Sequence, residues 1–394
     1  MQRGIFNRSQ YLAGNELAFV AGGMPYFTCL LQIINEAQKQ IHLQMYIFDE
    51  DDTGKEVATA LKSARQRGVD IYLAVDSYGS KDLSPAFIKD LKDSGINFRF
   101  FSPLPKRFYI LRLGRRLHSK VVVADQEVAL VGGVNISDKY RGTDTEAPWL
   151  DFAITVKGPV SARLARISEQ IYREKYLIGP HIRRKKSAHP SSRDVLSRPV
   201  LNDWFRGKRQ IGAGYRAAFR KAQHSITVVA SYFLPSRSIR TALKRAARRG
   251  VQVNLLLPGI SDVPMAKRAI RYLYQEMLEV NIQIYEWETS ILHGKMAIVD
   301  NKWVTLGSYN LNHLSQYSSI ELNLEVLDDA FAASVQRYLS TLLSQSTLID
   351  ADAFRQKMSR MEKILDWASY TLGRWIMSFL FFLVRREHRY KEKE

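Results

Sequence analysis

The sequence LHSKVVVAD at residues 117–125 organises the interpretation of the chain, and after six residues it is followed by GGVN at 132–135. The pattern recurs as LHGKMAIVD at 292–300, followed by GSYN at 307–310. Each copy has a His, a Lys two residues later, an Asp five residues after the Lys, and an Asn ten residues after the Asp. A single His-x-Lys triplet arises easily by chance, but two copies in the same register predict a shared function.

An apolar run follows the Lys in both copies and predicts a buried strand. Residues two positions apart on a strand point to the same face, so His118 is expected beside Lys120, and His293 beside Lys295. A neutral His can attack an electrophile or transfer protons, and an adjacent Lys can bind an anion. The glycine turn that follows the next short strand can bring the Asn of each copy back to the same place.

The composition indicates an anionic partner. The chain has 394 residues, enough for two ordinary domains, and its 58 Lys and Arg against 39 Asp and Glu leave a net charge of +19. This excess favours nucleic acid, a phospholipid surface or a phosphorylated substrate, although a basic surface can also serve solubility alone. Cys29 is the only cysteine, so no internal disulfide can form, which fits a reducing compartment. No zinc-type cluster of Cys and His is present.

Strand and helix patterns alternate ahead of the first motif. Apolar runs predict strands at 17–21, 41–48, 69–75 and 96–101, and helical spacing occurs at 25–39, 54–66 and 85–94. This alternation favours an α/β fold with a largely parallel sheet. The order recurs before the second motif, where LKRAARRGV at 243–251 resembles LKSARQRGV at 61–69. We therefore expect an internal duplication of a whole α/β unit.

The duplication predicts a first domain at residues 1–180 and a second at 200–350. Residues 181–199, which include the basic run RRKK at 183–186, lack periodicity and predict a linker or surface loop. A basic run of this length is most often simply solvated.

The tail, residues 351–394, has a different composition. Residues 375–384 are almost wholly apolar and aromatic, and basic residues follow them. About ten apolar residues cannot cross a hydrocarbon core of ~30 Å, and no other segment has ~20 uninterrupted apolar residues. The N-terminal residues 1–14 also lack an apolar core of signal-peptide length. We expect the tail to lie in a membrane interface, with a helix docked on the protein or in an oligomer as the alternative.

The two motifs resemble the paired HKD motifs of the phospholipase D superfamily, over about residues 14–345. The similarity is greatest to the bacterial cardiolipin synthase branch that lacks N-terminal membrane helices, through QMYIF at 44–48, DSYGS at 76–80, GGVN at 132–135 and WLD at 149–151. The resemblance implies two duplicated phospholipase D-like α/β/α units, each with a central mixed, largely parallel sheet flanked by helices, joined about a pseudo-two-fold axis. It implies one active site between the copies, with no metal and no other cofactor.

The resemblance also implies covalent catalysis on a phosphodiester. One His attacks the phosphorus and forms a phosphohistidine, while the other protonates the leaving alcohol and then deprotonates the incoming one. The resemblance assigns His118 as nucleophile and His293 as acid and base, although the residues alone do not distinguish the two. The groups expected to bind the phosphoryl oxygens are Lys120, Lys295, Asn135, Asn310 and Ser308. Asp125 and Asp300 complete the catalytic motifs, but they fall on the strand face opposite the Lys and are expected to be structural.

A carboxylate is expected to fix the tautomer of each His. Glu321 stands where the family has an acid after its second motif, and it is assigned to His293. Asp151 holds the comparable place after the first motif, and it is assigned to His118. Each carboxylate could instead form a surface salt bridge.

The leading hypothesis is a transphosphatidylase that transfers a phosphatidyl group from one phosphatidylglycerol to another, giving cardiolipin and glycerol. Its partners would be anionic phospholipid and the membrane surface. It would be a peripheral protein at the cytoplasmic face of a bacterial cell membrane. One alternative is a phosphodiesterase that acts on nucleic acid, although such an enzyme would not need the tail. The others are phosphatidyl exchange with another alcohol or with phosphatidylethanolamine, and a non-catalytic membrane scaffold. The oligomeric state does not follow from the sequence.

Overall fold

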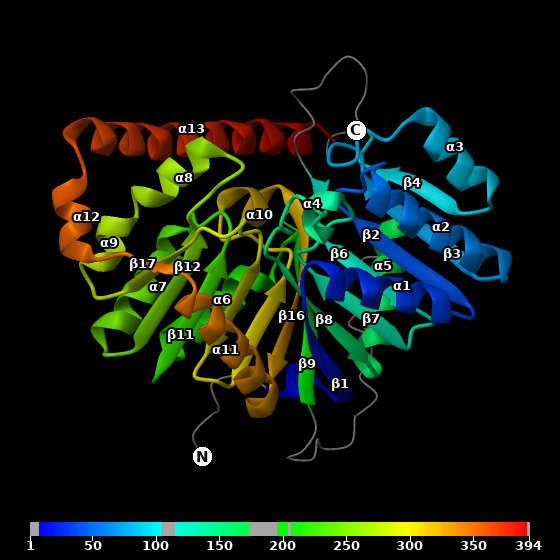
Figure 1. The fold of residues 1–394 in the computed structure, drawn as a ribbon, viewed down its shortest axis with the longest axis horizontal. Helices are drawn as coiled ribbons and strands as arrows, with labels where there is room; N and C mark the ends of the chain where they lie inside the picture. The colour runs from blue at the N-terminus through cyan, green and yellow to red at the C-terminus, as the bar shows by residue number, and fades with distance from the viewer. Residues whose placement is uncertain (1–7, 104–114, 174–194, 204–205, 392–394) are drawn as a thin grey trace.

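The computed structural model describes residues 8–103, 115–173, 195–203 and 206–391 (Figure 1). After the short helix η1 (Arg8–Gln10), the first half contains β1 (Leu12–Ala21), α1 (Met24–Glu36), β2 (Gln40–Met45), α2 (Asp52–Gln66), β3 (Asp70–Asp76), α3 (Pro85–Asp93), β4 (Asn97–Phe101), β5 (Arg116–Leu117), β6 (Lys120–Ala124), β7 (Val128–Gly132), α4 (Asp138–Arg141), β8 (Phe152–Lys157) and α5 (Pro159–Arg173). Each strand and helix predicted ahead of the first motif is present, with small differences at the ends.

The second half repeats this series and adds a C-terminal extension. Its elements are β9 (Val195–Asp203), β10 (Lys208–Arg209), α6 (Gln210–Lys221), β11 (Ser225–Ala230), α7 (Arg237–Arg248), β12 (Gln252–Pro258), α8 (Pro264–Arg271), α9 (Tyr274–Leu278), β13 (Gln283–Trp287), β14 (Lys295–Val299), β15 (Trp303–Gly307), α10 (His313–Tyr317), β16 (Ser319–Leu327) and α11 (Asp329–Ser344). The extension consists of β17 (Thr347–Leu348), α12 (Ala351–Lys357) and α13 (Arg360–Lys391).

The strand order confirms the duplication. The first half has the order β4-β3-β2-β6-β7-β8-β1, and the second has β13-β12-β11-β14-β15-β16-β9. The equivalent strands β1 and β9 pair with each other and run antiparallel, which joins the halves into one large sheet. Antiparallel pairing of equivalent strands relates the two halves by an approximate two-fold axis.

The sheet is mixed, as predicted, but the expectation that it is largely parallel is wrong. Among the described strands, the parallel pairs are those of β2-β3-β4 in the first half, those of β11-β12-β13 in the second, and the short pair β5–β16. The motif strands β6 and β14 pair antiparallel with both neighbours. The cause is local, because only three residues separate β6 from β7, and a parallel crossover needs a dozen or more residues.

Three large apolar clusters and one small one hold the described part of the fold together. One lies between the first half of the sheet and helices α1 and α2, and a second, between the other half and α6, α7 and α9, is its equivalent. A third cluster lies between the two halves, where apolar residues of β6, β7 and β8 gather with those of β14, β15 and β16, together with α5 and α11. This shared core fixes the halves against each other and so sets the distance between the two motifs.

The predicted boundary between the halves needs a correction. Residues 195–199, expected as linker, form the first part of β9, which is the counterpart of β1 and pairs with both β1 and β16. Pro199 stands inside this strand, and because a Pro argues against a central strand, the apolar residues on either side of it were not recognised as one element. Residues 181–194, including the basic run at 183–186, lie outside the described residues.

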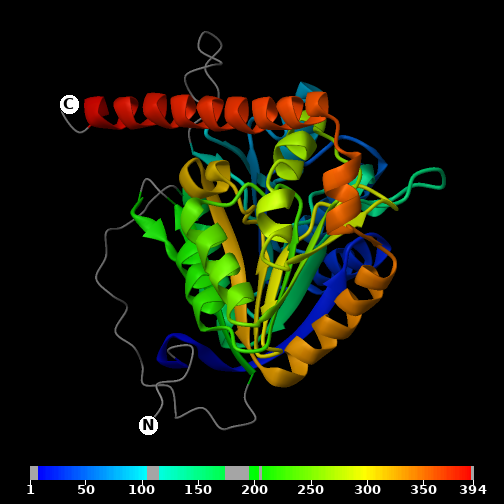
Figure 2. The ribbon, with the colours of Figure 1, turned by 90° about the vertical axis from the view of Figure 1, so that its left-hand side faces the viewer.

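After the short helix α12, the tail forms one long helix across one end of the molecule. Figures 1 and 2 show this helix, α13, lying over α8 and α10, and it packs on α8. Among the described residues, no helix combines the length and apolarity that a membrane-spanning segment needs.

Candidate active site

Both motif histidines line one cavity of about 470 Å³ between the two halves. His118 precedes β6 and His293 precedes β14, so each stands at the start of a motif strand. Two contacts across the halves bring these starts together: β5 pairs in parallel with β16, and Leu150 forms a bridge with Leu292. The predicted meeting of the two copies at one site is therefore what the fold produces.

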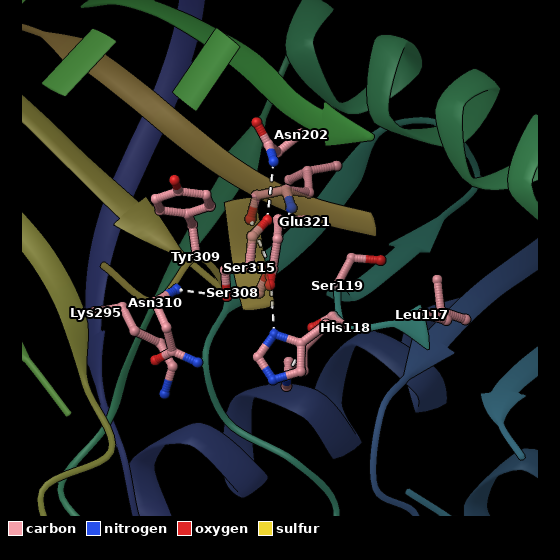
Figure 3. A network of polar contacts seen from close by, with 12 residues as sticks. Leu117, His118, Ser119, Asn202, Lys295, Ser308, Tyr309, Asn310, Ser315 and Glu321 are labelled. Atoms are coloured by element: carbon pink, nitrogen blue, oxygen red, sulfur yellow. Dashed lines mark hydrogen bonds and ion pairs between the residues drawn. The ribbon is translucent and has the colours of Figure 1, made fainter. Parts of the chain in front are cut away.

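His118 is held by a carboxylate of the second half. Its Nδ1 lies 2.8 Å from Oε2 of Glu321 on β16 (Figure 3). At this distance the buried carboxylate accepts the hydrogen bond of the Nδ1 proton, which leaves Nε2 as the nitrogen that faces the cavity. Burial lowers the pKa of His118, and the Glu321 carboxylate opposes this shift. The neutral imidazole is therefore favoured, in the tautomer that has a free electron pair on Nε2.

His293 has the mirror arrangement. Its Nδ1 lies 2.6 Å from Oδ2 of Asp151, a buried residue of the first half. On the other side of the ring, Nε2 lies 3.3 Å from the hydroxyl of Tyr140. Burial, followed by the positive charges of Lys295 and Lys120, lowers the pKa of His293 well below its ordinary value.

The predicted pairing of carboxylates and histidines is thus reversed. Glu321, assigned to His293, binds His118, and Asp151, assigned to His118, binds His293. The assignment assumed that each acid serves the motif that precedes it in sequence. Each carboxylate instead lies beside the motif of the other half. Glu321 is on β16, which pairs with β5 just ahead of His118, and Asp151 directly follows Leu150, which forms a bridge with Leu292 just ahead of His293.

The two motif lysines are buried beside the histidines. The ammonium of Lys120 donates to the backbone oxygen of His118 at 2.7 Å and lies 5.1 Å from the ring centre of Tyr46. The ammonium of Lys295 donates to the backbone oxygen of His293 and lies 2.8 Å from Nδ1 of that residue. Burial lowers the pKa of Lys120 to about 7 and that of Lys295 to about 8, with Asp151 and Glu321 opposing both shifts.

Asn135 and Asn310 also line the cavity. The amide nitrogen of Asn135 donates to Tyr140 at 2.7 Å, and its oxygen accepts from the backbone of Ile47. The oxygen of Asn310 accepts from the hydroxyl of Ser231 at 2.9 Å, which directs the amide nitrogen away from that contact. Both side chains are therefore oriented by the protein through their oxygens, and their nitrogens are the groups that a phosphate could meet.

Ser308 does not have the predicted role. Its side chain is fully buried and donates to Oε2 of Glu321 rather than facing the cavity. Its counterpart Gly133 has no room for a side chain, because a Cβ there would lie 2.4 Å from Oδ1 of Asp151. The sequences GGVN and GSYN therefore differ because each turn contacts a different carboxylate: the Ser of GSYN donates to Glu321, and the second Gly of GGVN leaves space for Asp151.

The motif aspartates lie away from the cavity, so the structure does not bring them together with the other residues of the predicted catalytic set, and their contacts fit the structural role expected for them. Asp125 accepts three backbone N–H groups, at residues 38–40. Burial alone would raise the pKa of Asp125, but these backbone bonds together lower it. Asp300 repeats the arrangement with the N–H groups at residues 223–225. Each aspartate fastens the hairpin after its motif strand to the start of the neighbouring strand.

Several aromatic residues of the site were not predicted. The ring of Tyr46 packs edge-on against His118 at 4.8 Å, and the rings of Tyr140 and Trp149 pack against His293 at 5.1 and 5.9 Å. Two signals were available for Tyr46: it lies in the stretch QMYIF that carries the family resemblance, and it comes immediately after the apolar strand β2, where parallel strands end at a common edge. Trp149 likewise lies in the stretch WLD. Tyr140 had no such signal, because it belongs to the short helix α4.

Comparison with known proteins places this geometry in a family. The model of the cardiolipin synthase, phospholipase D-like domain matches residues 30–164 and 215–343. Cardiolipin synthase B of Salmonella typhimurium is 32% identical over 84% of this chain and 81% of its own length, and that of Escherichia coli K12 is 31% identical with the same coverage. The cardiolipin synthase of Geobacillus kaustophilus is 29% identical over 88% of this chain and 70% of its own length.

Solved structures share the fold. The phosphatidylserine synthase of Haemophilus influenzae has a TM-score of 0.70 at 14% identity and covers 95% of this chain and 97% of its own. The polyphosphate kinase of Porphyromonas gingivalis has a TM-score of 0.58 at 16% identity, covering 93% of this chain and 53% of its own. With both repeats matched, the chain belongs to the cardiolipin synthase family of phospholipase D-like proteins.

Proposed function

We propose that this enzyme transfers a phosphatidyl group from one phosphatidylglycerol to another through a phosphohistidine, releasing glycerol and forming cardiolipin. The observation that carries the proposal is the pair of histidines in one cavity, each with its Nδ1 held by a buried carboxylate and its Nε2 available for chemistry. The cavity wall is mainly apolar away from the histidines, with Leu234, Val263 and Met265 among its residues, and suits the diacylglycerol part of a lipid.

The first half-reaction cleaves the donor. The step starts with His293 as the imidazolium, a form that the bound anionic phosphodiester favours. Nε2 of His118 attacks phosphorus, the bond from phosphorus to the glycerol headgroup oxygen breaks, and the imidazolium of His293 gives its Nε2 proton to that oxygen. The burial of Lys120 and Lys295 keeps their charges unscreened, so that they stabilise the phosphoryl oxygens as negative charge develops. The incoming anion offsets the cost of burying the two ammonium groups and the imidazolium of His293.

The second half-reaction uses the same groups in reverse. The primary hydroxyl of a second phosphatidylglycerol loses its proton to His293 and attacks phosphorus, and the phosphorus–nitrogen bond to His118 breaks. Asn135 and Asn310 would donate from their amide nitrogens to the phosphoryl oxygens in both steps. Glu321 and Asp151 act as positioning residues, because each stabilises the charged form of its His during turnover.

Purified protein incubated with phosphatidylglycerol vesicles should form cardiolipin and glycerol in equal amounts. His118→Gln should abolish this reaction, while His224→Gln, at an exposed position outside the cavity, should leave it unchanged. Vesicles that also contain phosphatidylethanolamine test the alternative lipid. A separate reaction with single-stranded DNA tests the alternative substrate. DNA cleavage without lipid turnover would overturn the proposal.

A second assay distinguishes the two histidines. A phosphatidyl p-nitrophenol has a leaving group that needs no proton, so His293→Gln should still release a burst of one p-nitrophenolate per enzyme and retain an acid-labile phosphoryl group. His118→Gln should give no burst. The opposite result would exchange the assigned roles. We also place the protein at the cytoplasmic face of the membrane, which cell fractionation with protease protection would test.

A further inference from the structure

The long helix α13 has its polar side toward the protein and its apolar side outward. A helix advances about 100° per residue, so Asp366, Ser369, Tyr370 and Gly373 share one side. Asp366 is fully buried, Ser369 lines the active-site cavity, and Tyr370 stacks on Tyr272 of the body at 4.7 Å. This side is therefore the one that packs on the protein.

The opposite side of α13 carries large apolar residues that are 42% to 72% exposed, namely Met361, Ile364, Leu365, Leu372 and Trp375. Their spacing of three, four and seven residues places them in one stripe along the helix. An ordinary surface helix has the reverse arrangement, with its apolar stripe on the core. An outward stripe of this size marks a surface that meets another apolar phase.

A buried ion pair fixes this orientation. The carboxylate of Asp366 accepts from Arg271 of α8 at 2.6 and 3.0 Å, and Arg268 of the same helix lies 3.6 Å away. Helix α8 is also a wall of the active-site cavity, through Met265 and Ala269. The position of α13 is therefore tied to the cavity rather than set independently.

The cavity rim lies at the same end of the molecule as the apolar stripe. Val263, Met265 and Leu314 line the cavity, yet each is about 40% exposed, so they stand at its mouth. Figures 1 and 2 both show α13 across the same end of the molecule as α8 and α10, the helices that supply Met265 and Leu314. We name the stripe and the rim together the apolar docking face: Met361, Ile364, Leu365, Leu372, Trp375, Val263, Met265 and Leu314.

We propose that the apolar docking face lies on the surface of an anionic phospholipid bilayer and so opens the cavity directly to lipid, an inference that rests on the proposed lipid substrate. Charge complementarity identifies the occupant. Arg360, Lys363 and Arg374 are exposed along one flank of the stripe, where they would meet lipid phosphates. A second copy of the chain, placed stripe to stripe, would bring the same cations together.

Flotation on vesicles tests the docking directly. Full-length protein should float with vesicles of equal phosphatidylglycerol and phosphatidylcholine, and far less with phosphatidylcholine alone. The triple variant Ile364→Ser, Leu372→Ser, Trp375→Ser should lower the partition coefficient about 100-fold, since each side chain contributes roughly fivefold. Met24→Ser with Leu348→Ser is the matched control, because both residues are 52% exposed and lie outside the face. Equal flotation of the two variants would refute the proposal.

Activity on two forms of one substrate separates the docking from the chemistry. Monomeric dihexanoyl phosphatidylglycerol needs no bilayer, so the triple variant should turn it over like the unmodified protein while losing at least tenfold on vesicles. A wild-type protein that floats but turns over neither form would refute the proposed function and leave the docking standing. Sedimentation tests a different occupant. If the wild-type protein is a dimer, the triple variant is a monomer and both float equally well, the face is a contact between copies and the proposal is refuted.

Discussion

Replacement of Glu321 by Gln tests the crossed pairing at the centre of the site. Gln keeps the size of the side chain and an oxygen that can accept from Nδ1 of His118, but it removes the negative charge. Two donors, His118 and Ser308, converge on the same carboxylate oxygen, Oε2. The substitution therefore leaves the geometry in place and removes the stabilisation of the positive charge that the ring of His118 carries while its Nε2 is bonded to phosphorus.

The loss can be bounded from the contact. A hydrogen bond to a charged group contributes about 1.5–3 kcal/mol, and 1.36 kcal/mol corresponds to tenfold in rate. A fully buried carboxylate at 2.8 Å from Nδ1 belongs in the upper part of that range. We expect Glu321→Gln to lower kcat on phosphatidylglycerol by about 10- to 150-fold, with little change in KM.

Glu325→Gln is the matched control. Glu325 lies on the same strand and is equally buried, but its carboxylate binds Tyr11 and Arg198 instead of a histidine. This variant should lose thermal stability and keep its kcat within about twofold, because no group of the cavity is involved. Equal losses of kcat in both variants would mean that the effect of Glu321 is a general one on the strand.

Nitrogen NMR of the imidazole rings shows which His each carboxylate serves. Glu321→Gln should shift the ring signals of His118 and leave those of His293, while Asp151→Asn should do the reverse. A shift of the His293 signals in Glu321→Gln would refute the crossed pairing and restore the pairing by sequence order.

Three further outcomes are expected. In pH profiles, kcat/KM should fall as the pH rises, because the acid His293, whose pKa burial lowers well below its ordinary value, loses its proton, and because Lys120, with a pKa of about 7, and Lys295, with a pKa of about 8, lose theirs. A value still rising at pH 9 would contradict this reading. Asp125→Ala should lower the free energy of unfolding in urea titrations by about 1–3 kcal/mol, because three backbone N–H groups lose their acceptor. The kcat of the folded enzyme should not change, and a loss of kcat at unchanged stability would return Asp125 to the catalytic set. Gly133→Ser should lower kcat at least about tenfold by displacing Asp151 from His293, and activity at the unmodified level would show that the turn can yield.

The local part of the structure could be predicted because its causes are local. Apolar runs and helical spacing located the elements ahead of the first motif, and the register of His118 with Lys120 placed both at the start of one strand. The glycine turn did bring Asn135 back to the cavity, as the spacing implied. These features depend on residues within about twenty positions of each other, where the chain geometry leaves few choices.

The errors arose where contacts join distant parts of the chain. The antiparallel majority of the sheet follows from hairpins such as β6–β7, which a count of alternating elements does not capture. The start of the second repeat was hidden because Pro199 interrupts the pattern of β9. The partners of Glu321 and Asp151 lie 203 and 142 residues away in sequence, so no local spacing could assign them.

The crossing of the two carboxylates has a consequence for how the site is assembled. Each His becomes oriented only when the other half is in place, so the apolar core between the halves positions both histidines at once. Both carboxylates have a second donor: Oε2 of Glu321 accepts from the hydroxyl of Ser308, and Oδ1 of Asp151 accepts from the backbone N–H of Phe152 at 2.7 Å. The two histidines differ on the cavity side, because Nε2 of His293 lies 3.3 Å from the hydroxyl of Tyr140, whereas the described contacts give Nε2 of His118 no such hydroxyl. An attacking nitrogen needs an open approach, and a proton carrier benefits from a nearby hydroxyl, so this difference favours His118 as the nucleophile and His293 as the acid and base.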